Sequence, residues 1–208
     1  MAKIDPNFDL VKAVIESAEK GNPQAQYQLG KMYASGDLVE MSYMEAVRWV
    51  GEAAEQGLHD AFPMMAWFYS NGFGVDQDDL KSAAWTRKGA EAGIAKAQYT
   101  LACMYRLGGA GCEQDAKQML HWYHESAQQQ YGPALHALGK VMATGELVAE
   151  DKIGAYQWLS LAIISGSEKA KESLKSLSSR MSKQERETAQ SILAQAAPHL
   201  ENIQQTEH

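Results

Sequence analysis

The sequence predicts an all-α protein, a right-handed superhelix (solenoid) of about eleven antiparallel helices. Alanine occurs 31 times, whereas valine, isoleucine and threonine together occur 21 times, so the composition favours helix over strand. The same residue types also return at a spacing near 36 residues. Within each period, apolar residues recur at three- and four-residue steps and a glycine divides the period in two. This pattern indicates two helices per repeat.

Four columns of the repeat stay in register to within one residue. The tryptophans are spaced by 36, 37 and 36 residues, and the glycines by 36, 36 and 37. The columns are Trp49, Trp85, Trp122 and Trp158; Gly36, Gly72, Gly108 and Gly145; Ala25, Ala61, Ala97 and Ala134; and Leu29, Met65, Leu101 and Leu138. Two short helices cannot bury both of their apolar faces alone, so we expect stacked repeats to share one core.

Local signals predict where the helices of the first repeat begin and end. The front helix should run from Pro23, which suits a first turn, to Ser35. Gly36 should close it in the left-handed conformation. The back helix should begin after Ser42, which forms a capping box with Glu45. The equivalent N-caps in the later repeats are Asp78, Asp115 and Asp151.

We expect a single repeat domain over residues 1–208. Gly57 and Gly93 separate consecutive repeats, whereas the third repeat ends in the glutamine run 128–130. Further helices are expected near 170–177 and after the capping box of Ser182. The predicted parts are an N-terminal capping helix (1–20), four helix-pair repeats (21–57, 58–93, 94–130 and 131–166), and C-terminal capping helices with a tail (167–208).

Charge and cysteine content limit the partners and the compartment. The formal net charge is −7, from 19 basic and 26 acidic residues, which argues against nucleic acid as a partner. Residues 1–9 show no secretion leader, and the longest uncharged apolar run, 158–165, is too short to span a membrane. The two cysteines, Cys103 and Cys112, fit a reducing compartment. We therefore expect a cytoplasmic protein without membrane insertion, and the sequence leaves the oligomeric state open.

The repeated residues resemble a known family. The match in the first repeat reads Ala25-x-x-x-Leu29-Gly30-x-Met32-Tyr33-x-x-Gly36, then Ala46-x-x-Trp49, then Ala53-Ala54-Glu55-Gln56-Gly57. This text resembles the Sel-one-like repeats (SLR), relatives of the tetratricopeptide repeats, and four copies cover roughly 21–166. The resemblance implies a non-enzymatic adaptor or scaffold that binds proteins, here in a bacterial cell.

Some positions depart from the family pattern. Ala66 and Ala102 stand where the first repeat has Gly30. We expect this difference to affect local packing more than the fold. Some secreted members of the family carry one cysteine pair per repeat. Cys103 and Cys112 do not occupy those columns, so the chain does not resemble that branch.

The histidines and cysteines give little support for a catalytic or metal site. His121 and His124 are one helical turn apart and His136 follows early in the next helix, but a zinc site needs three or four supported ligands. A nucleophile–base pair of Cys103 with one of these histidines lacks an orienting acid. We expect no catalytic residue, metal or cofactor. The sequence leaves open whether the histidines bind metal and whether Cys103 or Cys112 is reactive.

Two further patterns also fail as ligand sites. The acidic run 76–79 has Lys81 and Arg87 where a calcium loop needs glycine and glutamate. The glycine-rich run 108–111 follows a helix and lacks the lysine of a phosphate-binding loop. We interpret the first as a helix cap and the second as a turn.

A stripe on the front helices, next to their core-facing side, is the predicted protein-binding surface. Its candidate residues are Tyr27, Lys31, Trp67, Ser70, Lys96, Tyr99, Arg106, His136 and Lys140. Aromatic anchors beside cations suit an extended peptide with apolar and acidic side chains or a C-terminal carboxylate. Tyr27 and Tyr99 fit equally well as packing between neighbouring front helices. Trp67 is the stronger candidate. Lys31 and Lys140 occupy the equivalent position in other repeats, so packing of the repeats does not require an aromatic residue there.

The sequence therefore predicts a protein–protein adaptor whose concave groove, lined by the front helices, docks a peptide or protein. The alternative is a regulatory inhibitor or immunity-type protein that wraps and neutralises one partner. A self-assembling structural subunit and a metal- or thiol-dependent enzyme are less favoured.

Overall fold

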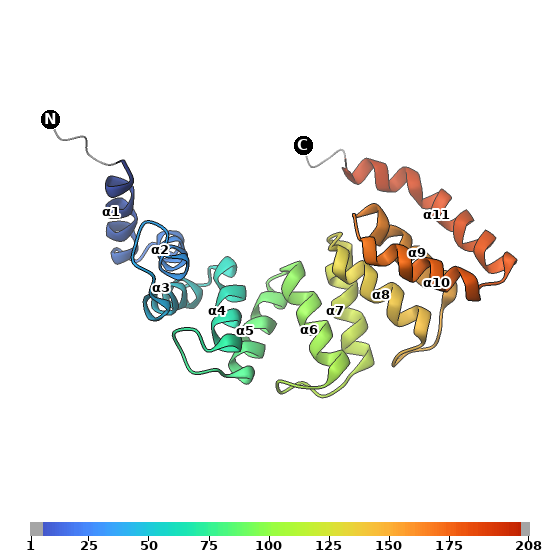
Figure 1. The fold of residues 1–208 in the computed structure, drawn as a ribbon, viewed down its shortest axis with the longest axis horizontal. Coiled ribbons are helices and arrows are strands. Elements are labelled where there is room, and N and C mark those ends of the chain that lie inside the picture. Colours follow the sequence, from blue (N-terminus) through green and yellow to red (C-terminus); the bar gives the residue numbers. More distant parts are fainter. Residues whose placement is uncertain (1–5, 205–208) are drawn as a thin grey trace. The chain divides into compact units, whose positions relative to one another are not determined.

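The structure, a computed structural model, describes residues 6–204 (Figure 1). Over that range it contains eleven α-helices and one 3-10 helix, with no strand beyond an isolated bridge between Gly109 and Cys112. The predicted all-α class is confirmed. Two compact units divide the chain: the first holds the residues up to 97 with 109–112, and the second holds 98–108 and the residues from 113 onward.

Each unit is a succession of short helices. The first holds α1 (Pro6–Glu19), α2 (Pro23–Ser35), α3 (Tyr43–Glu55), η1 (His59–Ala61), α4 (Phe62–Asn71), α5 (Asp79–Glu91) and the first residues of α6 (Ala95–Leu107). The second holds the rest of α6, then α7 (Ala116–Gln128), α8 (Gly132–Thr144), α9 (Lys152–Ile164), α10 (Glu168–Arg180) and α11 (Lys183–Gln204). None of the helices within 6–204 combines the length and apolar character needed to cross a membrane.

The predicted helix ends are confirmed at both kinds of terminus. The front helix α2 runs from Pro23 to Ser35. The side chains of Ser42, Asp78, Asp115 and Asp151 accept first-turn N–H groups of α3, α5, α7 and α9 at 2.8 to 3.3 Å. Left-handed glycines end α2, α4 and α8. These local interactions satisfy backbone groups that a helix leaves unpaired at its ends.

The front helix of the second repeat differs from the others because of Pro63. This proline lies in the first turn of α4 and has no N–H to donate to the carbonyl of His59. The preceding residues form η1, in which the N–H of Phe62 bonds to the His59 carbonyl. Pro63 lies four residues after the position that is equivalent to Pro23. It therefore shortens the α-helix and leaves a 3-10 turn before it.

A glutamine closes the third repeat in the conformation that glycine adopts elsewhere. Gly57, Gly93 and Gly166 have φ values of 83°, 85° and 87° after α3, α5 and α9. Gln130 occupies the same position after α7 with φ 57°. A side chain in the left-handed region is strained, so the turn geometry prevails over the preference of this residue.

The tryptophan column marks equivalent core positions on the back helices. Trp49 on α3 is buried, with 6% of its surface exposed. Trp85 on α5 is half-buried against the core of the first unit. Trp122 on α7 and Trp158 on α9 are half-buried against the core of the second unit. All four tryptophans therefore pack against a hydrophobic core, and Trp49 is the most deeply buried of them.

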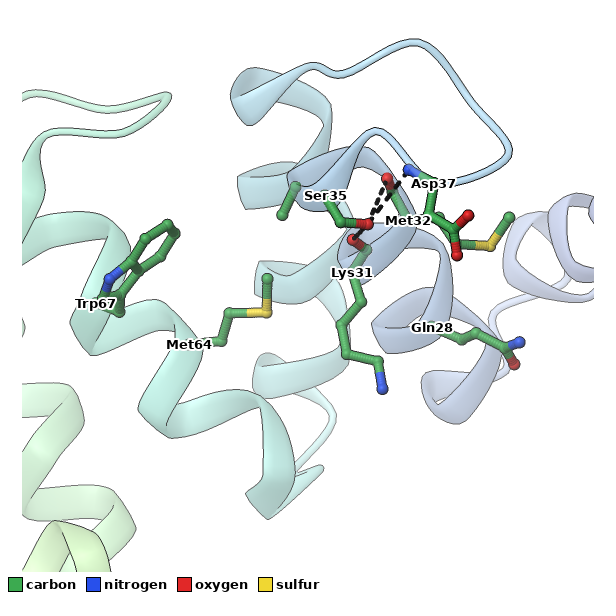
Figure 2. Close-up of a pocket in the computed structure, with 8 residues that line it drawn as sticks. Gln28, Lys31, Met32, Ser35, Asp37, Met64 and Trp67 are labelled. Atoms are coloured by element: carbon green, nitrogen blue, oxygen red, sulfur yellow. Dashed lines mark hydrogen bonds between the residues drawn. The ribbon is translucent and has the colours of Figure 1, made fainter.

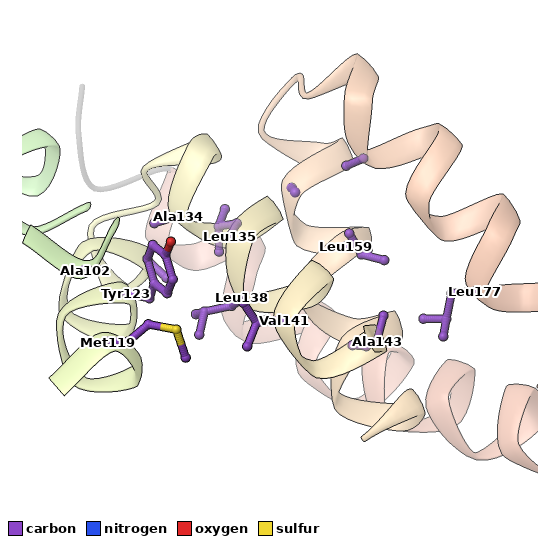
Figure 3. Close-up of a cluster of buried hydrophobic side chains, with 14 of the residues drawn as sticks. Ala102, Met119, Tyr123, Ala134, Leu135, Leu138, Val141, Ala143, Leu159 and Leu177 are labelled. Atoms are coloured by element: carbon purple, nitrogen blue, oxygen red, sulfur yellow. The ribbon is translucent and has the colours of Figure 1, made fainter. Parts of the chain in front are cut away.

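Each unit has its own buried core. In the first, Val50 on α3 and Phe68 on α4 are fully buried. Figure 3 shows the core of the second unit, where Tyr123, Leu138 and Leu159 are almost completely excluded from solvent. These cores fix the spacing of the front helices that carry the candidate binding residues.

Candidate protein-binding surfaces

The first candidate surface is an open cavity of about 570 Å³ lined by α2 and α4 in the first unit. Figure 2 shows Lys31 on α2 opposite Met64 and Trp67 on α4. The predicted stripe residues Lys31 and Trp67 thus line one cavity. Asp37, just after α2, also lines it.

Aromatic neighbours hold Trp67 in place while leaving it accessible. Its ring centroid lies 4.9 Å from that of Phe73, 5.4 Å from that of Phe68 and 6.2 Å from that of Tyr43. Even so, 41% of its surface is exposed. A large ring that is already ordered loses little conformational entropy when a partner covers it. This combination is typical of a binding anchor.

Two other predicted residues of the first unit have structural contacts. The ammonium group of Lys31 lies 5.1 Å from the ring centroid of Tyr27, which packs against the core. Burial raises the pKa of Tyr27, and the Asp60 carboxylate raises it further. The Ser70 hydroxyl donates to the Trp67 carbonyl at 3.0 Å. Neither Tyr27 nor Ser70 lines the cavity, so both act as supports beside it.

The second candidate surface is a cavity of about 270 Å³ in the second unit. Four predicted residues line it: Tyr99 and Arg106 from α6, and His136 and Lys140 from α8. The predicted Lys96, at the start of α6, lines neither this cavity nor the first. The other polar residues of the wall are Tyr123, Glu146 and Lys169.

Burial, with a smaller contribution from hydrogen bonding, raises the pKa of both tyrosines of this cavity above the ordinary 10, at which a phenol is already neutral near pH 7. Tyr99 packs against Tyr123 and Tyr131, with ring centroids 5.8 and 5.7 Å away. Burial raises the pKa of Tyr99 to about 12, helped by the neighbouring Cys103. Burial also raises the pKa of Tyr123, whose hydroxyl oxygen lies 3.3 Å from the Cys103 sulfur. The phenols therefore add no negative charge near neutral pH.

His136 is held as a neutral donor. Its Nε2 atom lies 2.9 Å from the Ser173 hydroxyl oxygen, and that hydroxyl donates to the Lys169 carbonyl. The hydroxyl therefore accepts the imidazole N–H. Burial lowers the pKa of His136, and the positive charges of Lys140 and Lys169 lower it further. The imidazole is accordingly uncharged near neutral pH.

The remaining histidines and cysteines make separate contacts. The His121 ring lies 4.8 Å from that of Trp122, and the His124 ring lies 5.2 Å from that of Trp158. Burial lowers the pKa of His124. Cys112 is buried, with its sulfur 3.6 Å from an Arg87 nitrogen. Within the described part of the chain, no three histidine, cysteine, aspartate or glutamate side chains gather as a metal site would require.

Sequence reasoning missed three important lining residues. Lys169 could have been predicted from the repeat. Pro133 is the equivalent of Lys96 in the fourth repeat, and Lys169 follows it by a further 36 residues. Met64 stands 36 residues after Gln28, just outside the predicted stripe. Glu146 lies in the loop after α8, whose side-chain direction no helical periodicity predicts.

Known proteins with the same repeat support this architecture. The Sel1 repeat family model matches residues 23–58, 64–94, 95–131 and 132–167. A protective antigen of uropathogenic Escherichia coli strains, which displays an SLR fold, is 28% identical, with a TM-score of 0.78 over 86% of this chain and 37% of that one. A Sel1 repeat protein from Oxalobacter formigenes is 35% identical, with a TM-score of 0.74 over 80% of this chain and 48% of that one.

The chain spans less than half the length of either of these two structures. No curated protein matches it. The two structural likenesses confirm the predicted solenoid fold class, and the family match confirms the resemblance found in the repeats.

Proposed function

The chain belongs to the Sel1 repeat family, and we propose that it is an adaptor whose front helices dock a peptide or protein partner. Sel1 repeat proteins are in general non-catalytic scaffolds for protein–protein interaction. The observation that carries the proposal is Trp67, a large ring braced by aromatic neighbours, 41% exposed, and set beside Met64 over an open cavity.

The proposed contact residues form two sets, one in each compact unit. Lys31 and Trp67 carry the first set, with Tyr27 and Ser70 as supports. The second set consists of Tyr99, Arg106, His136 and Lys140. Lys96 stays a proposed contact on the same stripe of α6.

We propose that residues 1–208 work as one domain, with repeats at 21–57, 58–93, 94–130 and 131–166 between helical caps. We place the adaptor in the cytoplasm of a bacterial cell and assign it no catalytic role. The low cysteine content, two residues in 208, supports a reducing compartment.

Affinity capture with the immobilised chain, followed by cross-linking, tests the adaptor function. Trp67→Ala should reduce recovery of the partner at least tenfold, because anchors of this kind contribute about 2 kcal/mol or more. Arg106→Glu should reduce it as well by reversing a charge in the second set. Cross-links should map to α2 and α4 or to α6 and α8.

Leu80→Ala is the matched control, because Leu80 is 65% exposed on the back helix α5. Recovery should be unchanged in this variant, and thermal unfolding should show that every variant is folded. Equal recovery by Trp67→Ala and the wild type would refute the proposed surface. A stoichiometric complex in which the partner loses its activity would favour the regulatory inhibitor instead.

A further inference from the structure

In the second unit, a second cavity lies next to the one described above, along α8. This neighbour has a volume of about 310 Å³ and is lined by residues of α8 and α10. Lys140 lines both cavities, so they lie next to each other on either side of its side chain or around it. We call the two adjacent cavities together the α8 groove.

Positive charge prevails in the α8 groove. Arg106, Lys140 and Lys169 line the first cavity together with one carboxylate, that of Glu146. Lys140 and Arg180 line the second together with Glu172. The chain as a whole has a formal net charge of −7, so this surface runs against its overall charge. Such a local excess attracts anionic groups and repels cationic ones.

The cations of the groove differ in their availability. Arg106 donates to a Glu146 carboxylate oxygen at 2.9 Å, and Arg180 donates to Glu150 at 3.1 Å. Lys140 and Lys169 form no ion pair with any side chain that the structure describes. Two exposed ammonium groups, one on α8 and one on α10, therefore line the same cavity without an ion-pair partner among the described side chains.

We propose that the α8 groove binds an extended peptide segment carrying several acidic side chains. The proposal rests on the adaptor function proposed above and names the chemistry of the partner. One carboxylate pairs with Lys140 and another with Lys169, while apolar parts of the segment cover Tyr99. The Arg106–Glu146 pair sits at the wall, where a further ligand carboxylate competes with Glu146 for the guanidinium group.

The geometry favours an extended acidic peptide over other anions. The cations are distributed over two adjacent cavities, which suits several spaced carboxylates. The carboxylates of Glu146 and Glu172 within the same walls oppose a densely charged phosphate chain.

Fluorescence anisotropy with a labelled, amidated peptide that alternates leucine and glutamate tests the proposal. The wild type should bind it at least tenfold more tightly than the same peptide with glutamine in place of glutamate. The double variant Lys140→Glu/Lys169→Glu should lose at least tenfold in affinity for the glutamate peptide. An equally short labelled oligonucleotide serves as the competing anion.

Lys117→Glu/Lys175→Glu is the matched control. It changes the net charge by the same amount at exposed lysines on α7 and α10 that line neither cavity of the groove. It should weaken binding less than about threefold, through long-range electrostatics alone. Equal losses in both double variants, or equal affinity for the two peptides, would overturn the proposal. Tighter binding of the oligonucleotide than of the glutamate peptide would overturn it too.

Glu146→Gln provides the reciprocal test, because a gain in affinity does not arise from misfolding. Loss of this carboxylate leaves Arg106 available to the ligand, so binding of the glutamate peptide should tighten about threefold to fivefold, the effect of one partly exposed ion pair. Unchanged or weaker binding would place the peptide outside this groove. If these peptide-binding tests fail while partner capture still depends on Trp67, the proposed adaptor function is retained and only the proposed acidic ligand is refuted.

Discussion

At the scale of single residues, Gly30 sets how closely α2 and α3 approach. A Cβ atom on Gly30 would lie 2.5 Å from a Val50 methyl carbon and 3.1 Å from the Ala46 carbonyl oxygen. Val50 is fully buried and β-branched, so it has no space to move aside. We expect Gly30→Ala to lower the free energy of unfolding by about 1–3 kcal/mol, measured from urea unfolding curves.

Gly51→Ala on the partner helix α3 is the matched control. A Cβ atom there would meet only the Met65 side chain at an ordinary 3.8 Å. The same substitution should therefore stabilise the protein by about 0.5–1 kcal/mol, because alanine favours a helix interior over glycine. A stability gain in both variants would show that α2 and α3 are not held together at Gly30.

Residue-level signals in the sequence are reliable where the structure they specify is local. The N-cap at Ser42 and the left-handed Gly36 follow from side-chain chemistry a few residues away, and both are confirmed. The φ of 57° at Gln130 was not foreseeable, because the turn imposes it on a residue that does not favour it. The late start of α4 near Pro63 could be predicted only by comparing the position of this proline with that of Pro23 in the first repeat.

At the scale of elements, α11 begins with a capping box in which both hydrogen bonds form. The Ser182 N–H donates to the Glu185 carboxylate at 2.6 Å, and the Glu185 N–H donates to the Ser182 hydroxyl at 3.1 Å. The first of these bonds is the main reason why the pKa of Glu185 lies below its ordinary 4.5.

The lowered pKa of Glu185 gives the start of α11 a pH dependence with a definite sign. A carboxyl group whose pKa falls on folding stabilises the folded state fully above its unfolded pKa. That contribution is lost as the pH falls through the lower, folded value. We expect the Ser182 amide resonance in NMR spectra to lose its hydrogen-bonded position only below pH 4.5, as the Glu185 carboxyl protonates.

Glu185→Gln removes the titrating group and should abolish this change, because an amide oxygen keeps the bond at every pH. Glu187→Gln, on the same helix but outside the capping box, should leave the transition in place. A Ser182 resonance that still titrates in Glu185→Gln would assign the pH dependence to another group.

Paired polar side chains tie front and back helices together within a repeat. The Gln56 amide donates to the Gln26 side-chain oxygen at 2.6 Å in the first repeat. The Gln129 amide donates to the Gln98 side-chain oxygen at 2.8 Å in the third. In each pair the front-helix glutamine is buried and its partner is exposed. A buried amide loses free energy when it is left without a partner, so each pair favours one alignment of its two helices.

At the scale of the whole molecule, the periodicity of the sequence predicts the helices better than it predicts the binding surfaces. Periodicity locates Trp67 and Arg106, because each belongs to a column that runs through every repeat. It does not locate Glu146, which reaches the cavity from a loop and pairs with a residue 40 positions earlier. Contacts between side chains of different elements depend on how those elements pack. The spacing of residues along one helix does not predict this packing.

The repeat architecture also predicts how destabilisation is distributed along the chain. Leu159 is fully buried in the core of the second unit, so Leu159→Ala should cost about 2–5 kcal/mol. In a repeat protein this loss is felt by the repeat concerned and its neighbours. We expect amide hydrogen exchange to accelerate in α8, α9 and α10, while α2 and α3 in the first unit keep their protection.

Val50→Ala is the mirror control, because Val50 occupies the same column in the first repeat and is equally buried. It should accelerate exchange in α2 and α3 and leave α8 and α9 protected. If each variant instead accelerated exchange equally in both units, the chain would unfold as one cooperative body. Long-range cooperativity would then have to outweigh the nearest-neighbour interactions from which a helical repeat array derives its stability.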